Sequence, residues 1–259
     1  MFDFYDGLYS FNLDESIYWV AYFETAEGIH YTGIQEKSLM EVANSLLADG
    51  DVEESEKNVL TSMMDLNDAV IALRGEDASL GHTYAPGVAN TNGLGNRNTG
   101  YQFGTSFKMK LIEPWGVRVR VLMRDKETGK LANYENADDY GLIFFHDKTT
   151  KYGGTLTPAQ MKAETEAKVY SKLEGNAVIN AGGVTAVYDH EIQTKDLDSE
   201  LYCLPYIVID GNYYYPSNAI CWNLLDEMVE FSEKDLDPKE TAAFNAILKM
   251  YDNVQNHKG

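Results

Sequence analysis

Hydrophobic and polar residues alternate along the middle of this 259-residue chain, which is the pattern of strands that bury one face. Val117, Val119 and Val121 alternate with arginines, and residues 142–145 form a short apolar run. Further strands are predicted at 107–111, 168–173, 177–179 and 184–188, with a brief helix after a capping box at 157–160. Short strands separated by frequent turn residues favour an Ig-like β-sandwich.

Apolar residues at helical spacing follow an acidic start in two further segments, 51–70 and 235–254. This pattern predicts two amphipathic helices. In the second segment we expect Asp237 to be the N-cap, Pro238 the first helical residue and Glu240 the capping-box partner.

The two helical segments also match each other in sequence. They align without a gap, and identical residues pair Asp51 with Asp235, Glu56 with Glu240, Asp68 with Asp252 and Val70 with Val254. With one-residue gaps the match extends upstream, pairing Tyr5 with Tyr188, Tyr18 with Tyr202, Tyr22 with Tyr206, Gly28 with Gly211 and Tyr31 with Tyr214. Hairpins are predicted from strands at 17–23 and 29–33, and from strands at 201–209 and 213–215 around the Asp210-Gly211 turn. We interpret the match as a partial internal duplication; the alternative is convergence of two generic patterns.

These elements predict an α+β protein with hairpin-plus-helices units at both ends. The expected organisation is a hairpin-plus-helices half-repeat at 1–75, a Gly/Asn-rich linker or loop at 76–104, a β-sandwich module at 105–216 and C-terminal helices at 217–259. The first hairpin has only residues 1–12 before it, so its edges are open to pairing. We expect it to pack on the chain's own sandwich or on that of a neighbouring subunit in a head-to-tail assembly.

Charge narrows the choice of partners. The chain carries 21 Lys and Arg against 41 Asp and Glu, a formal net charge of −20. Such a surface repels phosphate backbones and anionic lipid head groups, so we expect no nucleic-acid partner. We also expect no membrane insertion, since no apolar run is long enough to span a bilayer. The first residues lack a signal-peptide pattern, so a role outside the cell needs a removed signal or another route, such as a virus particle.

Residues 105–216 resemble a known kind of module. The segments that carry the resemblance lie at 113–119 and 140–145 and in the Tyr-rich hairpin at 201–215. They are similar to uncharacterised tandem-repeat modules, surface or phage-associated, encoded by gut clostridia. The resemblance implies a non-enzymatic module used in arrays, and it favours a cell-surface, extracellular or virion location over the cytoplasm.

The sequence carries no recognisable catalytic or metal-binding pattern. The histidines His30, His82, His146, His190 and His257 show no zinc-ligand spacing, and neither a nucleophile elbow nor a phosphate-binding loop occurs. The pair His146-Asp147 comes closest to a site, and a solvated strand terminus explains it. Cys203 and Cys221 are interpreted as two buried free thiols, the alternative being a single disulfide. We expect no enzyme, cofactor or metal site.

Aromatic residues give one positive signal for binding. Tyr213 and Tyr215 are predicted on the same face of a strand near Trp222, where they would form a surface strip. Such a strip stacks on sugars or on partner proteins, but a hydrophobic core with hydroxyls that reach its edge is the interpretation that we favour. We therefore predict a non-catalytic structural or interaction protein, an assembly or adhesion module of a bacterial surface or a phage virion, with a protein partner or self-association. The alternative function is a carbohydrate-binding module that binds a glycan through exposed Tyr and Trp.

Overall fold

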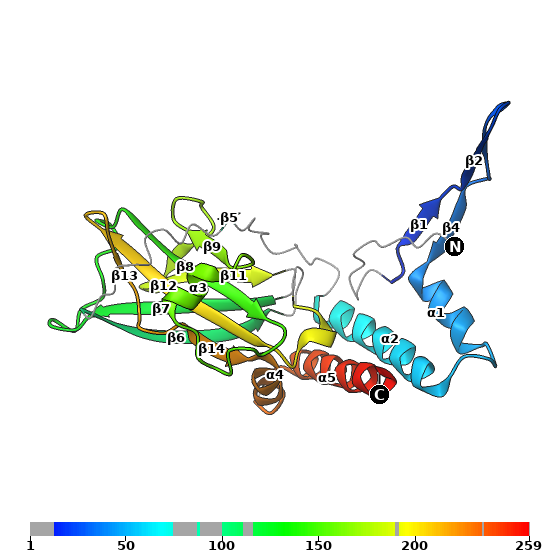
Figure 1. Cartoon of the computed structure of the whole chain (residues 1–259). Coiled ribbons are helices and arrows are strands. Elements are labelled where there is room, and N and C mark those ends of the chain that lie inside the picture. The colour runs from blue at the N-terminus through cyan, green and yellow to red at the C-terminus, as the bar shows by residue number, and fades with distance from the viewer. Residues whose placement is uncertain are drawn as a thin grey trace. The chain divides into compact units, whose positions relative to one another are not determined.

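The structure is a computed structural model that describes residues 13–74, 87–88, 100–110, 116–189, 192–234 and 236–258 (Figure 1). The chain forms two compact units, which we call the hairpin unit (residues 1–78 with 235–259) and the sheet unit (residues 79–234). Antiparallel sheets and helices occur in separate runs, so the predicted α+β class is confirmed. The predicted C-terminal helices at 217–259 are divided between the units, because the last helix packs against a helix of the N-terminal segment.

One sheet of the sheet unit has four antiparallel strands in the order β10-β11-β7-β6. These are β6 (Tyr101–Lys110), β7 (Gly116–Asp125), β10 (Val178–Asn180) and β11 (Gly183–Asp189). The predicted alternation is confirmed in β7, where Val117, Val119 and Val121 are buried and Arg118 is exposed. Most of the predicted linker at 76–104 and the end of the predicted strand at 107–111 lie outside the described residues.

The other sheet has the order β13-β12-β8-β9-β5, with β14 also paired to β12. Its strands are β5 (Gly87–Val88), β8 (Asp139–Asp147), β9 (Lys168–Ser171), β12 (Glu200–Ile209), β13 (Asn212–Tyr214) and β14 (Ile220–Asn223). Strand β12 has β8 along one edge and β13 and β14 along the other, and it is buried for most of its length.

Apolar side chains cover both faces of this larger sheet. Between the two sheets, the ring of Phe144 in β8 lies 5.3 Å from that of Tyr188 in β11. On the opposite face, residues of β8 and β12 form a second cluster with Leu156 and with Met161 of α3 (Pro158–Ala163). Helix α3 begins at the predicted capping box, which is confirmed. The 3-10 helix η1 (Thr194–Asp196) and helix α4 (Leu224–Ser232) complete the unit.

The hairpin unit combines short strands with helices. Its elements are β1 (Ser16–Trp19), β2 (Tyr22–Thr25), β3 (Gly28–Tyr31), β4 (Gln35–Ser38), α1 (Leu39–Leu47), α2 (Glu54–Arg74) and α5 (Pro238–Lys258). Helices α2 and α5 lie side by side and antiparallel (Figure 1), and Lys249 Nζ of α5 is 2.6 Å from Asp65 Oδ2 of α2. The predicted N-cap of α5 is confirmed, since Asp237 Oδ1 accepts a hydrogen bond from the Lys239 amide at 2.9 Å.

The two hairpin-plus-helices segments have the same element order and strand register. Helix α2 begins at Glu54 and helix α5 begins at Pro238, which is 184 positions later. With the same offset of 184 positions, β12 covers the positions of β1 and β2 together. The pairs that close the hairpins correspond too, Thr25–Gly28 with Ile209–Asn212. This register corrects the predicted alignment by one residue, because Gly28 corresponds to Asn212 and not to Gly211, and Tyr31 to Tyr215 and not to Tyr214.

Both cysteines are free, as predicted. Cys203 pairs with Ile220 and Cys221 pairs with Tyr202, so the two thiols lie on opposite faces of one sheet. Burial is complete for Cys203 and partial for Cys221. It raises the pKa of both thiols, that of Cys221 to about 11.

Candidate functional site

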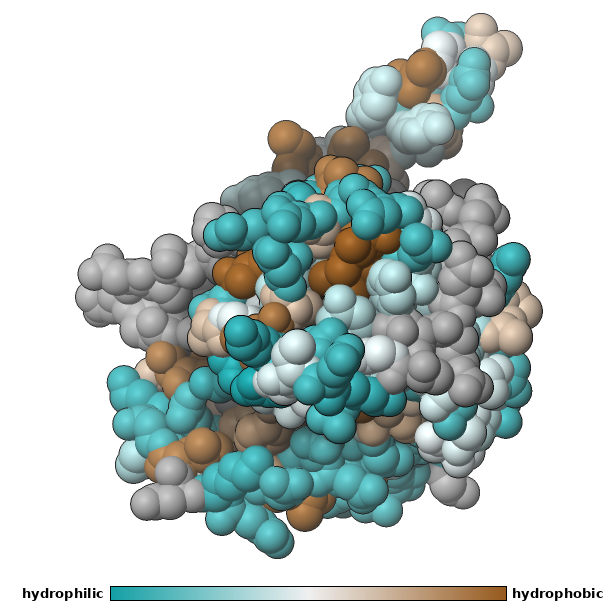
Figure 2. Space-filling model, turned by 90° about the vertical axis from the view of Figure 1, so that its left-hand side faces the viewer, coloured by the Kyte–Doolittle hydropathy of each residue, from teal (hydrophilic) through white to brown (hydrophobic). Residues whose placement is uncertain are grey.

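Strands β1 to β3 and their connections present large apolar side chains to solvent. The exposed residues are Ile17, Tyr18, Trp19, Val20, Tyr22, Phe23, Ile29, Tyr31 and Ile34, which we call the hairpin surface. At the top of Figure 2, the tip of the β2–β3 hairpin shows brown and pale residues among hydrophilic ones. Single exposed apolar residues are ordinary, but so many of them within residues 17–34 indicate an interaction site.

The matching positions of the sheet unit are buried. Tyr22 is 68% exposed and its counterpart Tyr206 only 4%, while Phe23 is 60% exposed and its counterpart Ile207 is fully buried. Two further exposed tyrosines, Tyr18 and Tyr31, correspond to the buried Tyr202 and Tyr215. Both faces of the hairpin therefore have the composition of core faces but lack a covering layer among the described residues of the hairpin unit.

Cross-strand contacts hold the exposed rings in place. Tyr22 and Tyr31 face each other across β2 and β3 with ring centroids 6.2 Å apart, and Phe23 stacks on His30 at 4.9 Å. The Tyr18 hydroxyl donates a hydrogen bond to Glu36 at 2.7 Å, and this bond raises the pKa of Tyr18 and lowers that of Glu36. An ordered aromatic surface loses less entropy when a partner binds.

The three predicted binding residues do not lie on one surface. Tyr215 follows the end of β13 and is buried, and Tyr213 is half-buried with its ring 5.8 Å from that of Tyr206. Trp222 projects from the opposite face of the same sheet, where its ring lies 5.0 Å from that of Phe107. The structure thus brings the two tyrosines together in the second cluster and separates them from the tryptophan.

His146 and Ser199 form a contact that resembles a nucleophile–base pair, with Nε2 and Oγ 2.6 Å apart. Both residues are buried, so the predicted solvated strand terminus at His146 is wrong. Ser199 donates its hydroxyl proton to the Asp196 carbonyl, so His146 Nε2 is the donor in this contact and the serine is the acceptor. Burial, together with nearby Lys148, lowers the pKa of His146 to about 4.

This proton arrangement is the reverse of an activated serine, in which the histidine accepts the hydroxyl proton and a third group orients the ring. Among the described residues, His146 Nδ1 has no hydrogen-bond partner that could orient it in this way. The contact between His146 and Ser199 therefore serves as a buried structural hydrogen bond.

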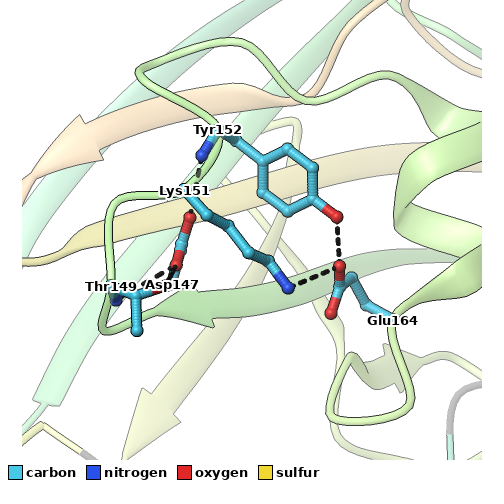
Figure 3. A network of polar contacts seen from close by, with 5 residues as sticks. All are labelled: Asp147, Thr149, Lys151, Tyr152 and Glu164. Atoms are coloured by element: carbon cyan, nitrogen blue, oxygen red, sulfur yellow. Dashed lines mark hydrogen bonds and ion pairs between the residues drawn. The ribbon is translucent and has the colours of Figure 1, made fainter.

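A second polar network holds the loop after β8 (Figure 3). The Asp147 carboxylate accepts hydrogen bonds from the Thr149 amide and hydroxyl and from the Tyr152 amide. Glu164 accepts a hydrogen bond from the Tyr152 hydroxyl and lies 2.9 Å from Lys151 Nζ. Both carboxylates are engaged by protein donors, so the network stabilises this loop.

Comparisons with known proteins add no functional assignment. No family model, curated protein or solved structure matches the chain. Within the described ranges, no three His, Cys, Asp or Glu side chains gather as metal ligands, and no helix is long and apolar enough to cross a membrane. The hairpin surface is therefore the candidate functional site.

Proposed function

We propose that the protein is a non-catalytic structural or interaction module that assembles through its hairpin surface. The observation that supports this is the contrast between Tyr22 and Tyr206, which share a register position but are 68% and 4% exposed. Burying one large apolar side chain contributes roughly 2 kcal/mol. Several such side chains lie together on the hairpin surface, so a partner that covers them gains a large share of its binding free energy there.

We further infer that β1 to α2 and β12 to α5 are copies of one ancestral unit. The shared element order, the shared register and the shared helix caps support this inference. Ser38 caps α1 by accepting from the amide of Glu41, as Asn223 caps α4 by accepting from that of Asp226. In this proposal the sheet unit is the sandwich module that covers the second copy, and the hairpin surface is exposed because the first copy has no equivalent cover among the described residues.

The proposed setting is a bacterial surface or a phage virion, where such modules are used in arrays. The resemblance of residues 105–216 supports this setting. The partner is a protein, either another copy of the chain or another component of the same assembly. The glycan-binding alternative loses its expected surface, since Tyr215 is buried and Trp222 lies on the other face of the sheet.

Sedimentation velocity across a range of concentrations tests the proposal. We expect the full chain to self-associate and a Tyr22→Lys/Phe23→Lys variant to sediment as a monomer. A Leu173→Lys/Val178→Lys variant is the matched control, because it adds the same charge at exposed apolar residues of the sheet unit. Association that survives the hairpin substitutions, or that both variants lose equally, would contradict assembly of copies through this surface.

A further inference from the structure

Strands β1 and β2 follow each other directly along the chain, and we call the segment that they form, residues 16–25, the β1–β2 ribbon. Only one edge of this ribbon is paired within the described part of the chain. Strand β1 pairs with β4 and β2 pairs with β3, while no described strand lies along their other edge. Between β1 and β2, the Ala21 amide donates to Thr32 Oγ1 at 3.0 Å and its carbonyl accepts from the Thr32 amide at 2.8 Å. Backbone groups alternate in direction along a strand, so Val20 and Tyr22 turn theirs toward the unpaired edge.

In the sheet unit, β8 fills the matching edge. It runs antiparallel to β12 and places Gly141 opposite Tyr206 and Ile143 opposite Leu204. A Cβ on Gly141 would clash first with the Tyr170 carbonyl of the neighbouring strand β9, and it would also lie 2.7 Å from the Tyr206 hydroxyl and 2.8 Å from the Tyr206 ring. Tyr22 occupies the position of Tyr206 in the hairpin unit, so a strand that pairs there in the same register places one residue against the Tyr22 ring, where glycine leaves the most room.

The two copies differ in charge at one position of this edge. Val208 faces Asp139 of β8, and its counterpart in the hairpin unit is Glu24. An acidic residue directly opposite Glu24 would be repelled. The hairpin unit also contains 21 of the 41 Asp and Glu residues but only 6 of the 21 Lys and Arg residues. Both features favour a basic residue in the incoming strand.

We propose that the β1–β2 edge accepts an extended strand from a partner protein by antiparallel strand addition. The incoming strand has a glycine opposite Tyr22, apolar residues opposite Val20 and Tyr18, and a basic residue opposite Glu24. Its backbone bonds to Val20 and Tyr22, and its apolar side chains bury part of the hairpin surface. The inference rests on the proposed function and defines the chemistry of the partner.

The probe is a fluorescent peptide with the sequence of residues 139–147, the substitution Asp139→Lys and a solubilising tail, titrated with the full chain. We expect saturable binding with one peptide per chain. A Gly141→Val peptide, although more apolar, should bind about tenfold more weakly because its side chain overpacks against Tyr22. Tyr22→Lys in the protein should abolish binding, while the exposed control Leu173→Lys should leave it unchanged.

Charge exchange gives an independent readout. The peptide that keeps Asp139 should bind the native chain more weakly than the Asp139→Lys peptide, and Glu24→Lys in the protein should reverse this order. Hydrogen exchange should show that bound peptide protects the Val20 and Tyr22 amides. Circular dichroism confirms that each variant is folded, as expected for substitutions at exposed residues.

Equal or tighter binding of the Gly141→Val peptide would show non-specific apolar adsorption and overturn strand addition, as would binding that survives Tyr22→Lys. These results are separable from failure of the proposed function. If the chain assembles through the hairpin surface but does not distinguish the peptides, assembly stands and strand addition is wrong. If the chain stays monomeric but distinguishes the peptides, strand addition stands and the partner is a different protein.

Discussion

Tyr206 and Tyr22 occupy the same register position in the two units, but one is buried and the other is exposed. Alanine substitution at each position compares the two environments within one protein. Tyr206→Ala removes a ring of the second cluster that is 4% exposed, whereas Tyr22→Ala removes one that is 68% exposed. The Tyr206 hydroxyl also donates a hydrogen bond to Asp139 Oδ2 at 2.9 Å. We expect Tyr206→Ala to destabilise the sheet unit strongly and Tyr22→Ala to have little effect on the hairpin unit.

The expected magnitudes follow from these environments. Truncation of a buried aromatic ring to alanine costs about 3–5 kcal/mol of unfolding free energy. Burial raises the pKa of Asp139 and the Tyr206 hydrogen bond opposes this shift, so loss of the hydroxyl leaves a poorly solvated carboxylate that costs about 1–3 kcal/mol more. Tyr22→Ala should change the unfolding free energy by no more than about 0.5 kcal/mol, as surface substitutions do.

Urea unfolding of dilute, unassembled protein, followed by circular dichroism, measures the difference. Tyr206→Phe keeps the ring and removes only the hydroxyl. Its loss of unfolding free energy should therefore equal only the hydrogen-bond part of the loss in Tyr206→Ala. A cost for Tyr22→Ala as large as that for Tyr206→Ala would show that Tyr22 is buried within a single chain. The hairpin surface would then not be an open interaction surface.

Three further predictions concern stability. Burial lowers the pKa of His146 from 6.5 to about 4, so the unfolded chain binds more protons than the folded chain between these pH values. Stability should therefore fall as the pH falls through this window. If His146→Gln leaves the pH dependence of the urea midpoint unchanged, this prediction is wrong. Gly141→Ala places a Cβ against the Tyr170 carbonyl and the Tyr206 ring, and should cost about 1–3 kcal/mol in the same assay; wild-type stability would show that the β8 backbone can shift. Asn223→Ala removes the cap of α4 and should cost about 1 kcal/mol, with Asn223→Asp restoring it; equal midpoints for the two variants would refute a capping role.

Local patterns in the sequence anticipate many elements of the fold. The alternation at Val117 to Val121, the capping box before α3 and the N-cap at Asp237 all act over a few residues, and each appears where it is predicted. The shared register of the two hairpins also follows from a sequence match, although gap placement shifted the alignment of Gly28 and Tyr31 by one residue. Hydrogen-bonded pairing fixes this register, and residue identity alone does not.

Features that depend on distant segments could not be predicted in the same way. Helix α5 joins the hairpin unit because it packs on α2, and periodicity does not indicate which apolar face a helix meets. Tyr215 and Trp222 appeared to share a surface, but β13 ends before Tyr215 and pairing with β12 turns Trp222 to the other face. His146 meets Ser199 only through the pairing of β8 with β12, and no sequence motif links them.

The composition of the β1–β2 edge is a further argument that it is built for a partner. Natural sheets protect exposed edges with charged residues, especially lysine, or with proline. In the sheet unit, edge strand β6 carries an exposed Lys108. Residues 16–25 contain no Lys, Arg or Pro, and Glu24 is their only charged residue. An edge that stayed in water would be open to indiscriminate pairing, so its retained tyrosines and single charge are better explained by a specific strand that covers it.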